Sequence, residues 1–171
     1  MKKPYINIDQ LIATEIAERL PGAPEKYRGA AVAPISALIG AERLGYNLTV
    51  VPPGKSAFPF HNHFGNEEMF FILEGEGELR YGTERHPLRA GDVIACPPGD
   101  AACAHQISNT STDATLRYLA VSTLQSPDMF QYPDSGKTGA SHYLDRDRLG
   151  FPDAIRIRNR TADNLDYWHG E

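Results

Sequence analysis

The chain has little of several features that would assign it to a particular class of protein. Its 171 residues include two cysteines, Cys96 and Cys103, which are too few for the disulfide framework of a small secreted domain. The formal net charge of −5 and the absence of a Lys/Arg-rich block provide no positive field for nucleic acid. No apolar run reaches the length of a membrane span. We therefore expect a cytoplasmic protein with no nucleic-acid partner and no membrane partner.

Helical periodicity is also scarce, and residues 7–20 are the main exception. Asp9 is a plausible N-cap, and Pro21-Gly22 would end the helix. The apolar residues that would form its buried stripe are Leu11, Ile12, Ile16 and Leu20. The pattern predicts a short amphipathic helix followed by a proline-rich linker. We expect residues 1–42 to pack on the outside of the domain that follows.

From Arg43 onward the sequence has the rhythm of short strands separated by turns. The expected strands are rich in β-branched and aromatic residues and end at Gly, Pro or Asn. They lie at residues 44–51, 69–73, 78–81, 85–88, 92–96, 105–108 and 115–123. No useful helical pattern interrupts them, which excludes a parallel α/β sheet. The rhythm predicts an all-β sandwich or small barrel.

Two histidines in this region have the spacing of a chelating pair. His61 and His63 are two residues apart, so their side chains leave the same face of a strand and nearly opposite faces of a helix. Glu68 lies an odd number of residues after His63, so one continuous strand would turn it to the other face. The chain must therefore reverse or bulge at residues 64–67, before a strand begins at Glu68. We interpret this stretch as part of a metal site.

A second motif follows, and the two together resemble those of the cupin superfamily. The residues that match the first cupin motif are Gly54, His61, His63, Glu68 and Gly75, and those that match the second are Gly91, Pro97, Gly99, His105 and Asn109. One extra residue separates Gly54 from His61. Five residues instead of the usual two separate Gly99 from His105, which we interpret as a three-residue insertion in the turn. The resemblance covers residues 43–123.

The resemblance implies an antiparallel jelly-roll β-barrel over residues 43–123, with residues 124–171 as an extended C-terminal tail of the same domain. It also implies one divalent metal near the middle of the barrel. The implied ligands are His61, His63, Glu68 and His105. Three neutral imidazoles and one carboxylate suit manganese, iron, nickel or zinc, and a six-coordinate ion would keep two positions open.

Strand alternation indicates which side chains line the pocket beside the metal. If Glu68 points inward, Phe70 and Ile72 do so too, because they lie two and four residues further along the strand. On the last strand either Arg117 or Tyr118 can face inward, and an inward Arg117 would favour a phosphate-bearing ligand. We prefer Tyr118, which leaves its apolar neighbours to pack outside. Phe70 and Tyr118 are the predicted substrate-binding residues.

Three functions remain open for such a site. The overall length and the long polar tail are similar to those of cupins described as sugar-phosphate isomerases, which favours a metal-dependent isomerase or epimerase acting on a small sugar or sugar phosphate. No catalytic base can be named from the sequence. The ligand set also permits an iron-dependent dioxygenase, and a non-catalytic small-molecule binding module is the third possibility. An apolar outer sheet face and long extensions predict a homodimer.

Overall fold

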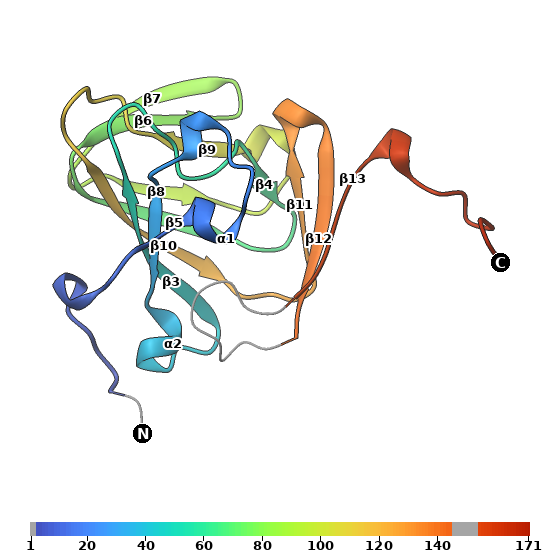
Figure 1. The fold of residues 1–171 in the computed structure, drawn as a ribbon, viewed down its shortest axis with the longest axis horizontal. Coiled ribbons are helices and arrows are strands. Elements are labelled where there is room, and N and C mark those ends of the chain that lie inside the picture. The colour runs from blue at the N-terminus through green and yellow to red at the C-terminus, as the bar shows by residue number, and fades with distance from the viewer. Residues whose placement is uncertain (1–2, 145–153) are drawn as a thin grey trace.

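The structure is a computed structural model that describes residues 3–144 and 154–171, and strands dominate it (Figure 1). The largest sheet has the antiparallel strand order β1-β2-β3-β10-β5-β8. Its strands are β1 (Thr14–Glu15), β2 (Ala31–Pro34), β3 (Leu44–Val51), β5 (Glu68–Glu74), β8 (Val93–Cys96) and β10 (Leu116–Thr123). β2 pairs with β1 on one side and with β3 on the other, so the N-terminal segment is part of the sheet.

Two smaller antiparallel sheets complete the barrel. One has the order β7-β6-β9 and consists of β6 (Glu76–Tyr81), β7 (Glu84–Arg89) and β9 (His105–Ser108). The other has the order β13-β12-β11-β4 and consists of β4 (Asn62–His63), β11 (Asp128–Tyr132), β12 (Lys137–Tyr143) and β13 (Ala154–Arg160). The all-β antiparallel fold predicted from the sequence is confirmed, and every strand expected between residues 43 and 123 is present.

The helix predicted over residues 7–20 is wrong for most of that range. The structure has a 3-10 turn at Ile8–Gln10, whose first turn is capped by Asn7 and not by Asp9, and then the extended β1. The helix α1 (Ile16–Arg19) is a single turn. The pairing of β1 with β2 provides hydrogen-bond partners for backbone N–H and C=O groups that would otherwise bond within a helix. This pairing outweighs the helical preference of the amphipathic pattern.

The remaining helical elements are also short. They are α2 (Ser36–Ile39) and the 3-10 turns Glu25–Tyr27, Ala101–Cys103, Pro133–Ser135 and Thr161–Asp163. Neither α-helix exceeds one turn, so none in the described part of the chain could cross a membrane.

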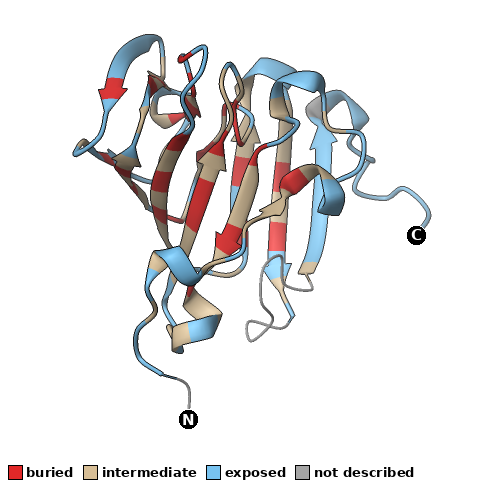
Figure 2. Ribbon diagram, turned by 60° about the vertical axis from the view of Figure 1, so that its left-hand side comes forward, coloured by how far each residue is buried: buried red, intermediate tan, exposed pale blue. Residues whose placement is uncertain are grey.

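The main core lies inside the barrel, on one face of the six-stranded sheet. Phe70, Ile72 and Tyr118 are buried there, whereas Leu73 and Leu119 pack in a second cluster on the opposite face. This alternation confirms the predicted orientation of β5 and the choice of Tyr118 over its neighbour. Figure 2 shows the buried positions concentrated in the central strands, with β13 almost wholly exposed.

The segment after Thr123 contributes three strands to the sheet that carries His63. β11 pairs on one side with β4 and on the other with β12, and β13 follows as the outer strand (Figure 1). Residues 145–153, which belong to the predicted C-terminal extension, lie outside the described residues. The predicted tail therefore supplies one wall around the histidine pair.

Candidate metal centre

Backbone pairing brings together segments that are far apart in the sequence. The amide of His61 donates to the carbonyl of His105 over 3.1 Å, and the amide of His105 donates back over 2.8 Å. On the other side, His63 pairs with Phe130 of β11. The chain leaves the strand conformation after His63 and resumes it at Glu68, as the sequence predicted.

All four predicted ligands converge on one point, which we call the donor cluster (His61, His63, Glu68 and His105). Its centre is Glu68 Oε2, which lies 2.9 Å from His105 Nε2 and 3.5 Å from His63 Nε2. The Nε2 atom of His61 is 3.7 Å from the same oxygen. The ligand atoms of His61, Glu68 and His105 all lie within 4.8 Å of one another. These distances suit side chains that share one metal ion.

The other nitrogen of each imidazole has a partner of its own. His61 Nδ1 lies 2.8 Å from the carbonyl oxygen of Pro59, and His105 Nδ1 lies 3.3 Å from that of Cys103. His63 Nδ1 lies 2.7 Å from Asp128 Oδ2. Without a metal, His105 Nε2 lies 2.9 Å from Glu68 Oε2 and donates a hydrogen bond to it. With a metal bound, a proton on each Nδ1 would satisfy these acceptors and direct the Nε2 lone pairs at the centre of the donor cluster. Three lone pairs facing a carboxylate repel one another unless a cation lies between them, so the donor set fits a divalent metal ion.

Burial and mutual charge shift the pKa values of the donor cluster. Burial opposes ionisation of Glu68, but the hydrogen bond from His105 and the neighbouring imidazoles outweigh it and lower its pKa to about 2. Burial lowers the pKa of His61 to about 4, against the charge of Glu68. For His63, burial is outweighed by the hydrogen bond to Asp128 and by the charge of Glu68, so its pKa is raised. Glu68 is thus ionised and His61 neutral at neutral pH, the forms that bind metals.

Asp128 is a candidate site residue that the sequence reasoning missed. Its carboxylate is 3% exposed, and Oδ2 is bound to His63, which fixes the ring of that histidine. Within residues 3–144 and 154–171, Oδ1 has no hydrogen-bond partner. Asp128 lies 65 residues after His63 and outside both motifs, so neither motif points to it. The only local signal is an acidic residue at the start of a strand.

The insertion before His105 forms a compact turn and leaves this histidine in the cluster. Asp100 accepts a hydrogen bond from the amide of Ala102, which starts the 3-10 turn at Ala101–Cys103. Gly99 donates its amide to the carbonyl of His63 over 2.8 Å. The side-chain amide of Asn62 donates to Gly99 over 2.7 Å. The turn is therefore tied to the histidine pair by hydrogen bonds.

Aromatic rings surround the donor cluster. Phe70 lies 5.5 Å from the His105 ring and contacts Tyr118 edge-on at 5.8 Å. Tyr118 is 2% exposed, and its burial raises the pKa of the phenol. Contact of these two residues with substrate stays a prediction. Two further rings, which the sequence reasoning missed, come from β11: Phe130 lies 6.2 Å from the His63 ring and Tyr132 stacks 6.1 Å from the His61 ring.

Comparison with known proteins agrees with the geometry of the site. The family described as "Cupin domain" matches residues 47–122. An uncharacterised protein of Methanocaldococcus jannaschii is 30% identical over 107 residues, which cover 63% of this chain and 69% of that protein. The chain belongs to the cupin family. The structure of a cupin-superfamily sugar phosphate isomerase from Silicibacter pomeroyi superposes with a TM-score of 0.71 at 23% identity, covering 96% of this cupin and 98% of that chain.

A further relative matches less than half of this cupin. The oxalate-binding protein of Thermotoga maritima is 38% identical over 71 residues. The match covers 42% of this cupin and 54% of that protein, so the chain spans about half the length of that relative.

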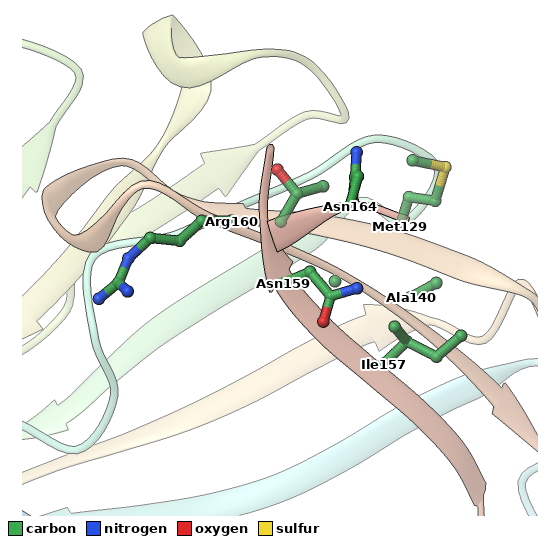
Figure 3. A pocket seen from close by; sticks show the side chains of 8 residues that line it. Met129, Ala140, Ile157, Asn159, Arg160 and Asn164 are labelled. Atoms are coloured by element: carbon green, nitrogen blue, oxygen red, sulfur yellow. The ribbon is translucent and has the colours of Figure 1, made fainter. Parts of the chain in front are cut away.

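Arg117, the alternative that was not preferred, faces outward as expected, and a pocket on the outer face does not belong to the site. Arg117 pairs with Glu74 over 3.1 Å on the outside of the sheet. A pocket of about 280 Å³ lies on the face of β11–β13 opposite to Phe130, where Met129 and Ile157 line it (Figure 3). The donor cluster of this cupin is on the other side of that sheet.

Proposed function

We propose that this cupin binds one divalent transition metal, which is manganese, iron, nickel or zinc, through the donor cluster. The observation that supports the proposal is the direction of the three imidazoles, whose Nε2 atoms surround the ionised Glu68 while their Nδ1 atoms face other acceptors. Imidazole and carboxylate ligands in this ratio suit these metals. Asp128 would hold the His63 ring in place as the ion binds.

We further propose that the metal site makes this cupin an isomerase or epimerase of a small sugar or sugar phosphate. A bound ion would act as a Lewis acid on a carbonyl or hydroxyl oxygen of the substrate. Phe70 and the stacked Tyr132 would exclude water on two sides of the cluster and offer the apolar surfaces against which a sugar can lie. The likeness to the Silicibacter pomeroyi isomerase extends over nearly the whole chain but concerns the fold, so the reaction itself remains a proposal.

The test is hydrogen exchange at carbon. Aldose and ketose sugars and their phosphates would be incubated with the metal-loaded protein in D2O, and the products analysed by proton NMR. An isomerase incorporates deuterium at the carbon next to the carbonyl, and the incorporation disappears when the metal is removed by a chelator. Absence of exchange across the panel would refute the proposed reaction. Oxygen consumption that depends on iron would instead support the dioxygenase alternative.

A second candidate function is capture of a small dicarboxylate without turnover. It is favoured by the 38% identity to the Thermotoga maritima oxalate-binding protein over 71 residues. An ion with two open coordination positions could take both carboxylates of such a ligand directly. Calorimetry with oxalate distinguishes the two functions, because a binding module would hold oxalate tightly and leave it chemically unchanged.

A further inference from the structure

One face of β13 carries a row of cations, which we call the arginine row (Arg156, Arg158 and Arg160). The antiparallel register places Arg158 opposite Gly139, which in turn lies opposite Phe130. Residues that pair in this way project from the same face of a sheet. Since the Phe130 ring lies against His63, the arginine row shares the face that carries the donor cluster. Arg160 also lines the outer pocket, and in Figure 3 its side chain extends away from those of Met129, Asn159 and Ile157.

The side chain of Arg158 reaches back toward the donor cluster. Its Cζ atom lies 5.5 Å from the centroid of the Phe130 ring, which is 6.2 Å from the centroid of the His63 ring. The distance from Arg158 Cζ to the centroid of the His63 ring therefore cannot exceed the sum of these two distances. Gly139 leaves room for this arrangement, because a Cβ there would press on the Phe130 ring and lie 2.7 Å from the backbone oxygen of Ile157. An open-chain sugar phosphate can span the gap.

This face of the sheet is positively charged, although the chain as a whole carries a net negative charge. Lys137 adds a fourth cation, 5.3 Å from the Tyr132 ring that stacks on His61. Strands β11, β12 and β13 together contain a single carboxylate, Asp128, and it is bound to His63. In the turn between β11 and β12, Asp134 accepts hydrogen bonds from Nη1 and Nη2 of Arg80, at 2.8 and 2.9 Å. A chain with a net charge of −5 thus concentrates positive charge beside its candidate metal centre.

We propose that the arginine row, with Arg158 as its principal contact, binds the phosphate group of a substrate whose other end lies at the donor cluster. The inference rests on the proposed function and specifies its substrate class as phosphate esters. A guanidinium stacked on an aromatic ring keeps its donor edge free, and that edge matches the oxygens of phosphate in a bidentate manner. An inward Arg117 would have favoured a phosphate-bearing ligand. In this proposal Arg158 of β13 makes the contact with phosphate instead.

The test compares one sugar with its phosphate ester. Binding of fructose 6-phosphate and of fructose to the metal-loaded full-length protein is measured by isothermal titration calorimetry. We expect the ester to bind at least about tenfold more tightly than the free sugar. Arg158→Gln removes most of this preference and leaves the affinity for fructose unchanged. Arg158→Lys retains part of it, because an ammonium keeps the charge and loses the bidentate geometry.

A charge-matched variant separates direct contact from a general field. Arg158→Gln combined with Asn159→Arg keeps the net charge and moves the guanidinium to the opposite face of β13. We expect this double variant to bind the ester as weakly as Arg158→Gln does, and recovery of the preference would overturn the proposal. Equal affinity of the unmodified protein for both probes, or equal loss of both in Arg158→Gln, would also overturn it. Calorimetry reports binding alone, so a failure of the isomerase test leaves this result interpretable.

Discussion

At the scale of single residues, Asp128 determines how one imidazole of the donor cluster is presented. A carboxylate bound to Nδ1 of a ligating histidine fixes the tautomer and raises the basicity of Nε2. In this structure that contact is 2.7 Å long, and the carboxylate is nearly inaccessible to solvent. His61 and His105 have backbone carbonyls in the same place, so His63 is the one ligand supported by a charge. The strength with which His63 would bind a metal therefore depends on the side chain of Asp128, which a mutation can change.

The first prediction concerns this support. Asp128→Asn keeps the size of the side chain and removes its charge, so we expect the affinity for metal at pH 7.5 to fall about 10- to 100-fold. The measurement is competition with a chelator of known affinity. Asp9→Asn makes the same chemical change at an exposed position in the first 3-10 turn and leaves the affinity unchanged. Equal affinities in the Asp128→Asn variant and the unmodified protein would contradict the assigned role.

The second prediction concerns pH in the metal-free protein. His61, with its pKa lowered to about 4, stays neutral in the fold while the unfolded chain takes up a proton near pH 6.5, so stability falls as the pH drops from about 6.5 to 4. His63 acts in the opposite sense, because its raised pKa contributes stability below 6.5 that is lost as the pH rises through the folded-state value.

NMR titration of the histidine rings measures this order directly. We expect His63 to titrate above pH 6.5 and His61 far below it. In Asp128→Asn the midpoint of His63 moves to lower pH, because the hydrogen bond that favours the imidazolium loses its charge. A common midpoint for the two rings would contradict the electrostatic description of the cluster.

The third prediction uses two adjacent glutamates. Glu68→Gln replaces the central carboxylate with a weaker neutral ligand, so we expect the purified protein to contain much less than one metal ion per chain. Glu67→Gln is the matched control, since Glu67 is exposed and lies just before β5, so this variant should retain the full metal content. Metal content is measured by elemental analysis. Equal metal contents in the two variants would refute the central role of Glu68.

The placement of the four donors could be predicted from the sequence because both motifs are local. His61 and His63 lie two residues apart, and the spacing from His105 to Asn109 survives the insertion. Asp128 could not be predicted, since its contact depends on the pairing of β4 with β11 across 65 residues. A single side-chain contact between distant residues produces no repeating pattern in the sequence from which it could be predicted.

At the scale of elements, β12 is shaped by a glycine in its middle. Gly139 lies between Phe130 and Arg158 in the register, and the ring of Phe130 occupies the space where its side chain would be. A glycine inside a strand usually weakens it, and here it allows a ring and a guanidinium to come together across the strand.

The fourth prediction tests this close approach. Gly139→Ala forces the Phe130 ring and the β13 backbone apart, so we expect the free energy of unfolding to fall by about 1–3 kcal/mol. Gly65→Ala is the control, because its new methyl group meets no described atom closer than 3.6 Å and should change stability by less than about 0.5 kcal/mol. Urea denaturation monitored by circular dichroism measures both. A neutral Gly139→Ala would show that β12 and β13 can separate without loss.

The elements themselves were predictable where strand alternation is strong. β5 and β10 follow the expected bounds and faces because one side of each is buried in the barrel and the other in a second cluster. The structure of the N-terminal segment could not be predicted in this way. Thr14 pairs with Val32, which is distant in the sequence, and a local amphipathic pattern cannot reveal such a pairing.

At the scale of the whole molecule, the predicted homodimer remains a prediction, and the outer face of β11–β13 is where we would test it. Met129, Ile155 and Ile157 are 52–56% exposed on that face. A second copy would cover these side chains by the same patch on both partners, as in most symmetric dimers. The edge of β13, which no described strand covers, lies beside them.

The fifth prediction follows from this face. Ile157→Glu introduces a charge at its centre, so we expect the molecular mass measured by light scattering to drop from that of a dimer to that of a monomer. Ile12→Glu, at a position that is 87% exposed near the N-terminus, leaves the mass unchanged. A monomeric unmodified protein would refute the predicted dimer.

The pairing of β4 with β11 also bears on how the protein is made. A ribosome delivers the histidine pair first, then Glu68 and His105, and only 65 residues after His63 the aspartate that supports it. During that interval the emerging barrel has its ligands without β11 beside His63 and without the wall formed by β11–β13. Domains fold as their residues become available during synthesis. Secure binding of a metal at the donor cluster would therefore be a late step, completed only when the C-terminal strands have been released.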